Sequence, residues 1–482
     1  MSERFRRPWN SNRVGLVSGL VLATLVLAWL PSVAWSQDAV RVAVWDIDAS
    51  PNVGAPLAYD PCDGVELPLT CRGVVLLSES APIVVCAVDW IGIGNGGHQY
   101  FREQLAEAAG TTVDRVAVHT LHQHDAPVAD LSASALLAEQ GIAEKVYDTP
   151  WFRDVVERAA NAIRAALPEA QVATHYAHAA GRVEKVASNR RILGPDGKVL
   201  YTRWTATRDA DIRAMPVGVI DPDLKLLCFY QNDRPIVALT FYATHPQSYY
   251  RTHLANPDFP GMARNQRQAA TETLHIHFNG AGGNITAGKW NDGEPANRQV
   301  LADRVADGMR LAWEALVPRP LSAEDIGWTS RSFTMPVSPS LNEAELDAIL
   351  KDAAATPAAR GMAAVDLIWL RRARAEEPSD IGCLRVGDSR WLFMPGELFV
   401  EYQLVAQRMR PDLFVGMAAY GDYGPGYIGT AIAYSQGGYE TSPRVSRVGE
   451  GTESVLLDAL RQLLDAEDST VTATDLSVAE PK

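Results

Sequence analysis

Four separated segments of this chain carry the residue types that build a catalytic metal centre. They are residues 122–127 (His-Gln-His-Asp-Ala-Pro), 244–246 (Thr-His-Pro), 395–397 (Pro-Gly-Glu) and a tyrosine-rich run over 420–439, and each follows a stretch with the pattern of a strand. Two imidazoles and a carboxylate, with one position left open for water, form a recurrent catalytic zinc set. The combination indicates metal-assisted hydrolysis rather than cofactor-bound redox chemistry or adhesion.

The histidine pair lies at the end of a predicted strand, residues 113–124. Side chains alternate between the two faces of a strand, so His122 and His124 would share one face and His119 would point away from them. The pair could then reach one site together. The alternative is that both are polar residues at a strand end that face solvent.

Two further candidate ligands also follow predicted strands. His245 comes at the end of the apolar stretch 236–244, and Glu397 follows residues 391–394. Ligand sites in open α/β sheets collect outside the carboxyl ends of strands, which favours a shared site. Taken singly, His245 could be structural, and Glu397 could simply mark a helix start, where acidic residues are stabilised.

A glycine-rich turn follows the predicted strand 274–278. Gly280, Gly282 and Gly283 would allow positive φ angles and a close approach of the backbone to a bound group. A nucleotide-phosphate loop is the alternative interpretation. It is disfavoured because the segment has neither a Gly-Lys-Ser/Thr ending nor GxGxxG spacing.

The order of predicted elements is that of an α/β protein. Strand-like and helix-like patterns alternate from about Val40, with helices predicted over residues 98–109, 151–167, 296–316 and 453–464. Residues 37–467 are expected to form one large domain without internal repeats. Within it, residues 341–377 suit two helices and are interpreted as a helical insertion or lid-like excursion. Residues 468–482 have the composition of a disordered tail.

Residues 1–36 have the features of a secretory signal peptide: a basic start, an apolar stretch and small residues around Ala34-Trp35-Ser36. The protein is therefore expected to be secreted or periplasmic, and an uncleaved N-terminal membrane anchor is the alternative. Export permits a disulfide, and a Cys62–Cys71 bond would close a short loop. The other three cysteines lie in apolar runs typical of buried thiols.

The chain is acidic, with a formal net charge of −14 from 44 Lys and Arg against 58 Asp and Glu. Nucleic-acid binding rests on neutralising phosphates with Lys and Arg, so this composition argues against it. It also gives no sign of electrostatic docking to anionic membranes.

Taken in order, the four segments resemble motifs of the neutral (non-lysosomal) ceramidase family, and the resemblance extends over about residues 40–464. Residues 122–127 are similar to the family's His-Thr-His-Ser-Gly-Pro, residues 242–248 to its Phe-Ala-Val-His-Pro-Thr-Ser, and residues 395–397 to its Pro-Gly-Glu. Residues 427–440 are similar to its tyrosine segment, and residues 189–191 to its Asn-Arg-Ser. The resemblance implies an α/β fold: one large mixed α/β zinc-hydrolase domain, expected without the family's C-terminal immunoglobulin-like domain.

The resemblance also implies a set of site residues. One zinc ion per chain would be held by His122, His245, Glu397 and Tyr427. The implied catalytic residues are His124 in proton transfer or substrate contact, Arg190 as an anion contact, Tyr439 at the developing oxyanion, and Thr286 at the position of the family's essential serine. Threonine keeps the hydroxyl, but its methyl group restricts χ1. Further departures from the family pattern are Asn284 for Asp, Asp125 for Ser and Ala126 for Gly.

The expected function is that of a secreted zinc-dependent amidohydrolase that cleaves the N-acyl amide bond of a ceramide-like lipid. Zinc would activate a water molecule for attack on the carbonyl carbon. The expected partners are a small-molecule or lipid N-acyl substrate and, transiently, a membrane surface. Two alternatives stay open: a zinc hydrolase of a different ester or amide, and a secreted binding protein without catalysis.

Overall fold

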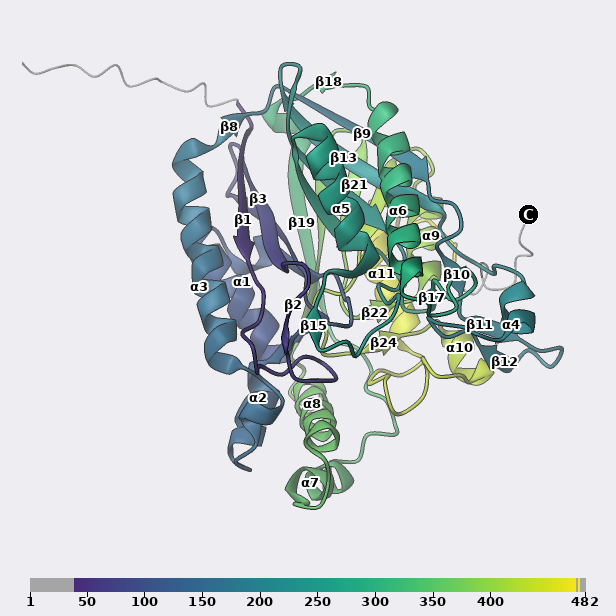
Figure 1. Cartoon of the computed structure of the whole chain (residues 1–482). Helices are drawn as coiled ribbons and strands as arrows, with labels where there is room; N and C mark the ends of the chain where they lie inside the picture. The colour runs from purple at the N-terminus through teal and green to yellow at the C-terminus, as the bar shows by residue number, and fades with distance from the viewer. Residues whose placement is uncertain (1–38, 474–475, 477–482) are drawn as a thin grey trace, which may run out of the picture. The chain divides into compact units, whose positions relative to one another are not determined.

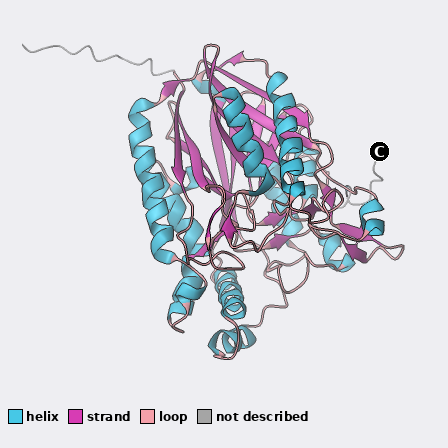
Figure 2. Cartoon of the chain, viewed as in Figure 1, coloured by secondary structure: helices cyan, strands magenta, loops and turns pink. Residues whose placement is uncertain are grey.

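Three β-sheets with the same strand order, each covered by helices, form the framework of the protein (Figures 1 and 2). The computed structural model describes residues 39–473 and residue 476. In each sheet two antiparallel strands are joined by a turn, a helix follows, and the chain returns as a strand parallel to the second of them. A further antiparallel strand lies beside the first. We call each sheet, with the two helices that cover it, a module.

Module 1 contains the sheet β6-β4-β3-β1-β8. Its strands are β1 (Arg41–Asp48), β3 (Thr70–Leu77), β4 (Ile83–Val88), β6 (Val116–Thr120) and β8 (Gln171–Val172). Helices α1 (Asn95–Ala109) and α3 (Thr149–Ala166) cover one face, on the left of Figure 1. The Asp148 carboxylate caps α3 by accepting a hydrogen bond from the Trp151 N–H, and the helix then buries Val155, Ala159 and Ile163, which are spaced four apart.

Module 2 repeats this arrangement with the sheet β16-β14-β13-β9-β18. Its strands are β9 (His175–Arg182), β13 (Asp223–Gln231), β14 (Arg234–Tyr242), β16 (Leu274–Asn279) and β18 (Arg319–Pro320). Helices α5 (Asp258–Thr271) and α6 (Ala296–Glu314) cover it. A Cβ atom at Gly181 would lie 2.1 Å from the Gly308 carbonyl oxygen, so only glycine allows α6 to approach β9 this closely.

Module 3 contains the four-stranded sheet β19-β20-β21-β23. Its strands are β19 (Ile326–Phe333), β20 (Ser379–Val386), β21 (Ser389–Phe393) and β23 (Phe414–Ala418). Helices α9 (Val400–Met409) and α11 (Thr452–Leu463) cover it. The described part of the predicted tail packs here, because Ala473 and Leu476 are buried in the core under α11; the rest of that tail lies outside the described residues.

A central core joins the three modules. Each sheet turns one face toward its own helices and the other toward the two neighbouring sheets, so its strands are apolar on both faces. Phe241 of module 2 stacks on Phe278 at 5.0 Å between ring centroids and lies 4.7 Å from Trp391 of module 3. Val85 of module 1 belongs to the same buried cluster.

The stretch predicted as a helical insertion contains two helices, α7 (Glu343–Lys351) and α8 (Pro357–Arg374), at the bottom of Figure 1. They pack against α2 (Leu131–Ala138) through a small apolar cluster of their own. Arg372 of α8 forms an ion pair with Asp422 at 2.8 Å, and Asp366 forms one with Arg447 at 2.6 Å. The insertion is therefore tied to the segment that follows β23.

Short elements fill the space at the ends of the main strands. They are β2 (Gly64–Val65), β5 (Gly92–Gly94), β7 (Val128–Asp130), β10 (Ser188–Asn189), β11 (Arg191–Leu193), β12 (Val199–Thr202), β15 (Leu254–Ala255), β17 (Ile285–Thr286), β22 (Glu397–Leu398), β24 (Tyr427–Ile428), α4 (Ala210–Ala214) and α10 (Ala431–Gln436).

The predicted α/β class is confirmed. The three modules share strand order and not residues, so the sequence shows no repeat. One expectation from the sequence is corrected. Cys62 and Cys71 are not bonded: Cys71 Sγ lies 3.6 Å from Cys86 Sγ on the neighbouring strand, and every described cysteine is a free, buried thiol.

Two expectations concern the N-terminus and the membrane. The predicted signal peptide lies outside the described residues. Among the residues from 39 onward that the structure describes, no helix is long and apolar enough to cross a membrane.

Replacing Phe241 by Ala is expected to lower the free energy of unfolding by about 3–5 kcal/mol, because it removes a ring at the junction of two modules and leaves a cavity. Chemical denaturation monitored by circular dichroism would measure the loss. Val300→Ala on the exposed side of α6 is the control and should change it by no more than about 0.5 kcal/mol. A similar small change for Phe241→Ala would contradict the central-core description.

Candidate metal centre

The ends of strands from all three modules meet at one place. The Thr120 N–H at the end of β6 donates to the Tyr420 carbonyl oxygen at 2.9 Å, which joins modules 1 and 3. The Ala419 N–H after β23 donates to the Asn279 carbonyl oxygen at 2.9 Å, which joins modules 3 and 2. Residues just beyond these strand ends therefore face a common space.

The histidine pair reaches this space from a loop, not from a strand as predicted. Strand β6 ends at Thr120, and a 3₁₀ turn over Val113–Arg115 precedes it. His122 has a left-handed backbone with φ of 63°, which is uncommon for a residue with a Cβ atom, and its N–H donates to the Trp90 carbonyl oxygen at 2.9 Å. Alternation along a strand is thus not what brings His122 and His124 together.

Three imidazoles lie side by side in this space. The candidate ligand atoms of His122, His124 and His245 all lie within 4.8 Å of one another, and all three side chains are buried. His119, as predicted, does not join them: its Nδ1 lies 2.8 Å from the Ala419 carbonyl oxygen, and burial lowers its pKa to about 3.

Backbone carbonyl groups orient two of the three rings. His122 Nδ1 lies 2.7 Å from the Ile91 carbonyl oxygen, and His245 Nδ1 lies 3.4 Å from that of Gly282. A carbonyl oxygen only accepts, so Nδ1 carries a proton in both rings and Nε2 is the nitrogen left to bind a metal. This is the arrangement by which a metal-binding imidazole is held through its second nitrogen.

His124 is oriented in the opposite sense. Its Nδ1 lies 3.0 Å from the Tyr59 hydroxyl and 3.0 Å from the Gln247 side-chain nitrogen. An amide nitrogen only donates, so Nδ1 accepts and the proton lies on Nε2. That Nε2 is 3.1 Å from Nε2 of His245. Burial, with smaller contributions from His122 and Arg190, holds the pKa of His124 well below its usual range.

Glu397 completes the group from module 3. It lies on β22, which pairs in parallel with β24 so that Glu397 is opposite Tyr427. Its Oε1 accepts from the Tyr423 hydroxyl at 2.8 Å, and its Oε2 lies 3.2 Å from His122 Nε2 without any hydrogen bond among the described residues. Burial acts to raise the pKa of Glu397, but His122 and hydrogen bonds from Tyr427 and Tyr423 outweigh it and leave the pKa lowered.

This donor set fits a metal ion. Oε2 of Glu397 and Nε2 of His122 are buried and 3.2 Å apart, an arrangement that needs a positive charge, supplied either by a proton on Nε2 or by a cation between the two atoms. Two imidazoles and a carboxylate are ligand types that zinc binds in catalytic sites.

A buried arginine, Arg190, contacts Tyr427. Arg190 Nη1 donates to the Tyr427 hydroxyl at 3.1 Å, and its Nε pairs with Glu440 at 3.1 Å. Burial raises the pKa of Tyr427 well above its usual value and Glu397 raises it further, whereas Arg190 lowers it. The Tyr439 ring lies 5.7 Å from that of Tyr427, and its hydroxyl has no hydrogen-bond partner in the described part of the chain.

Comparison with known proteins fixes the fold. Neither a family model nor a curated protein matches the sequence. Among solved structures, one titled "Ceramidase complexed with C2" aligns with a TM-score of 0.64 and 14% identity over 92% of this chain and 78% of that one. The neutral ceramidase from Pseudomonas aeruginosa aligns with a TM-score of 0.63 and 14% identity, over 92% and 76% of the two chains.

The chain has the neutral-ceramidase fold. The resemblance drawn from four short motifs is thereby confirmed at the level of the fold. All of the predicted site residues belong to the described part of the protein. Seven of them surround one space from the three modules: His122, His124, His245, Glu397, Tyr427, Arg190 and Tyr439.

Thr286, the eighth, lies on β17 and is buried. Strand β17 pairs with β10 so that Thr286 is opposite Ser188, two residues before Arg190. The Thr286 hydroxyl oxygen accepts a hydrogen bond from the Gly288 N–H at 3.1 Å. The neighbouring departure, Asn284, holds Glu401 at 2.8 Å and accepts from the Val400 N–H at 2.9 Å, so it fastens α9 to the glycine-rich turn.

Sequence reasoning assigned no role to several residues that contact the group. Tyr59 and Gln247 orient His124, Tyr423 orients Glu397, and the Tyr420 ring stacks on His122 at 4.3 Å between centroids. Tyr420 and Tyr423 stood in the tyrosine-rich run, where their place after a strand could have indicated a role. Tyr59 lies in a loop with no such signal.

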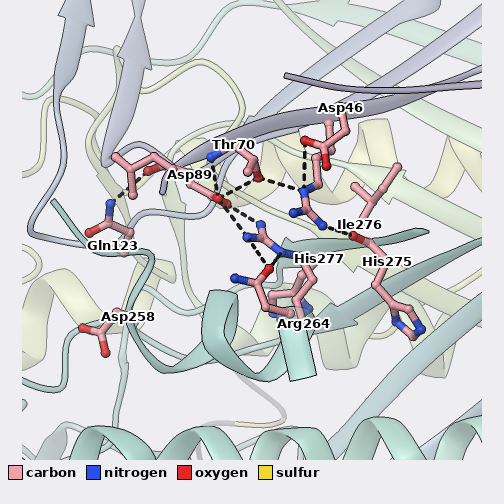
Figure 3. Close-up of polar contacts among 12 residues, drawn as sticks. Asp46, Thr70, Asp89, Gln123, Asp258, Arg264, His275, Ile276 and His277 are labelled. Atoms are coloured by element: carbon pink, nitrogen blue, oxygen red, sulfur yellow. Dashed lines mark hydrogen bonds and ion pairs between the residues drawn. The ribbon is translucent and has the colours of Figure 1, made fainter. Parts of the chain in front are cut away.

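A second buried network contacts the histidine loop through Gln123 (Figure 3). The Arg264 guanidinium and the Asp89 carboxylate form two hydrogen bonds, of 2.6 and 3.0 Å, and both side chains are buried. Burial acts to raise the pKa of Asp89, but Arg264 outweighs it and leaves the pKa lowered. The Asp89 carbonyl oxygen accepts from the Gln123 side chain at 2.9 Å, which fixes the residue between His122 and His124.

Arg264→Met is expected to lower the free energy of unfolding by about 3–5 kcal/mol, because it leaves the Asp89 carboxylate buried and unpaired. Urea denaturation would measure the loss. Arg158→Met removes an exposed partner of Asp154 and should cost far less, since exposed ion pairs contribute little. Equal losses in the two variants would contradict a supporting role for the buried pair.

Proposed function

We propose that this chain is a zinc-dependent hydrolase that cleaves an N-acyl amide bond. The observation that carries the proposal is the buried pair of His122 Nε2 and Glu397 Oε2, 3.2 Å apart, together with a second imidazole whose Nε2 is also free of a backbone partner. Such a set suits a cation. The neutral-ceramidase fold supports hydrolysis as the reaction class.

His122, His245, Glu397 and Tyr427 would hold the ion. A zinc ion bound there would supply Lewis-acid chemistry, lowering the pKa of water to about 7 and polarising a carbonyl group. Arg190 favours this ligand set because its positive charge stabilises the ionised form of the Tyr427 phenol. Tyr423 holds the Glu397 carboxylate through Oε1 and so directs Oε2 toward His122.

His124 would act as a hydrogen-bond donor toward the substrate. Its proton lies on Nε2, fixed there by Tyr59 and Gln247 at Nδ1. A neutral imidazole is a poor acid, but its N–H can stabilise the negative charge that develops on a carbonyl oxygen. The free Tyr439 hydroxyl is a second donor of this kind. Thr286 would position the loop that carries Arg190 through the β10–β17 pair.

The proposed substrate is a small-molecule or lipid N-acyl compound, and the proposed location is outside the cytoplasm. The first rests on the fold, and the second on the sequence of residues 1–36. The alternatives are hydrolysis of a different ester or amide and a binding protein without catalysis. The metal test below addresses the binding protein, and the activity test addresses the other hydrolase class.

Elemental mass spectrometry of the purified protein is expected to find about one zinc ion per chain. His245→Ala and Glu397→Ala should each lose it, since each removes a ligand. His119→Asn is the matched control: it replaces a buried histidine of the same region that faces away, and it should keep the metal. A folded wild-type protein without zinc would overturn the hydrolase proposal and favour the binding protein.

His124→Ala is expected to reduce kcat for release of fatty acid from an N-acyl sphingoid by about 10²–10³-fold, the usual effect of losing one oxyanion donor. His124→Gln, which keeps an N–H group, should retain more activity than His124→Ala, and both should keep zinc. If His124→Gln were as inactive as His124→Ala, hydrogen-bond donation would be the wrong role. Turnover of short-chain esters but of no N-acyl compound would favour the other hydrolase class.

A further inference from the structure

An arginine without an anionic partner lies beside the candidate metal centre. The Arg251 side chain is exposed, and among the described residues its guanidinium forms no hydrogen bond or ion pair. It lies instead over two tyrosine rings, with Cζ 5.3 Å from the Tyr59 centroid and 5.7 Å from the Tyr250 centroid. Both rings also contact His124, at 5.7 and 5.6 Å between centroids. We call Tyr59, Tyr250 and Arg251 the arginine rim.

The rim is fastened to the same segment that supplies His124. The Asp125 carboxylate accepts hydrogen bonds from the N–H groups of Arg251 and Thr252 at 2.8 and 3.3 Å, and from the Thr252 hydroxyl at 2.8 Å. Asp125 is itself paired with the buried Arg298 at 3.5 Å. Asp125 is one of the departures from the ceramidase motif, which has serine there. This chain thus holds Arg251 in place through a residue that the motif lacks.

Arg251 places a positive charge beside the site in a chain whose net charge is −14. A cation held over aromatic rings loses little mobility on binding, because it is already positioned. A guanidinium also matches the geometry of a carboxylate with two parallel hydrogen bonds.

Exposed apolar side chains gather in a different part of the surroundings. Leu193, Leu200 and Tyr201 on the β11–β12 hairpin are 40%, 55% and 41% exposed, and Trp204 just after it is 50% exposed. Trp204 contacts Tyr439 at 5.2 Å between ring centroids, so this apolar group reaches the site through the tyrosine pair. The arginine rim reaches it through His124. The arginine rim is positively charged, and the β11–β12 hairpin is apolar. These two properties match the carboxylate and the alkyl chain of an acylated amino acid.

We infer that the substrate is an N-acyl amino acid, whose carboxylate binds Arg251 while its alkyl chain lies toward the β11–β12 hairpin. The inference rests on the proposed hydrolase function and narrows its substrate class. In the reaction the amide C–N bond breaks, the oxygen of water joins the carbonyl carbon, and a proton goes to the nitrogen. The products are a fatty acid and a free amino acid.

Two probes that differ only in charge test this inference: N-dodecanoylglycine and N-dodecanoylglycinamide. Release of dodecanoic acid gives kcat/KM for each, and calorimetry gives each Kd without requiring turnover. The wild-type protein should prefer the carboxylate probe, and Arg251→Gln should reduce that preference by about 10- to 100-fold, the usual effect of one charge-assisted contact. Arg251→Lys should retain part of it. Arg153→Gln, which removes an exposed arginine stacked on Tyr100 away from the site, should leave it unchanged.

The outcomes separate the two proposals. Hydrolysis of both probes with a preference that does not depend on Arg251 would overturn the inference and leave the hydrolase proposal standing. No hydrolysis, with a Kd preference that Arg251→Gln abolishes, would support the carboxylate site and count against the hydrolase. A wild-type preference for the glycinamide in both measurements would exclude an anionic substrate.

Discussion

The candidate site exists because backbone groups from different modules hydrogen-bond where their strands end. Thr120 and Ala419 donate across the junctions between modules, to Tyr420 and Asn279, and Gly283 donates to Leu398. These bonds set how far each sheet is displaced along its strands relative to the other two, because the backbone groups at the strand ends must come within hydrogen-bonding distance. Once this displacement is set, residues that follow strands of all three modules share one space. Side-chain chemistry at the centre depends on this docking and does not produce it.

Several parts of the protein stabilise a backbone that is locally unfavourable. His122 and Tyr420 both have left-handed φ angles, 63° and 62°, and their rings stack on each other. Each such residue costs on the order of 1 kcal/mol or more and persists only where its surroundings hold it. The Asp89–Arg264 network holds the histidine loop through Gln123, and α8 holds the segment after β23 through Asp422. The insertion thus contributes to the site although it supplies no residue to it.

The sequence sufficed for the class of fold and for the residues most marked by type. His245 and Glu397 could be placed because apolar strands precede them, and Tyr427 and Arg190 because short motifs resemble those of a known family. It did not suffice for the path of the chain near His122, since a left-handed residue leaves no periodic signal. Nor could it show that Tyr59 lies against His124, because a contact between a loop and a site 65 positions away depends on tertiary packing. The shared strand order of the three modules could not be predicted from the sequence for a related reason: strand order can be kept while residues change.

Three modules with the same strand order surround a shared core. The arrangement is like that of a cyclic trimer whose subunits are joined into one chain. In a trimer of identical subunits every subunit would place the same side chain at the centre, and the site would be symmetric. Here one copy places two imidazoles, another a single imidazole, and the third a carboxylate and tyrosines. Because the three modules belong to one chain, their residues can differ. The proposed centre needs this asymmetry, since it would bind a metal ion on one side and present a proton on another.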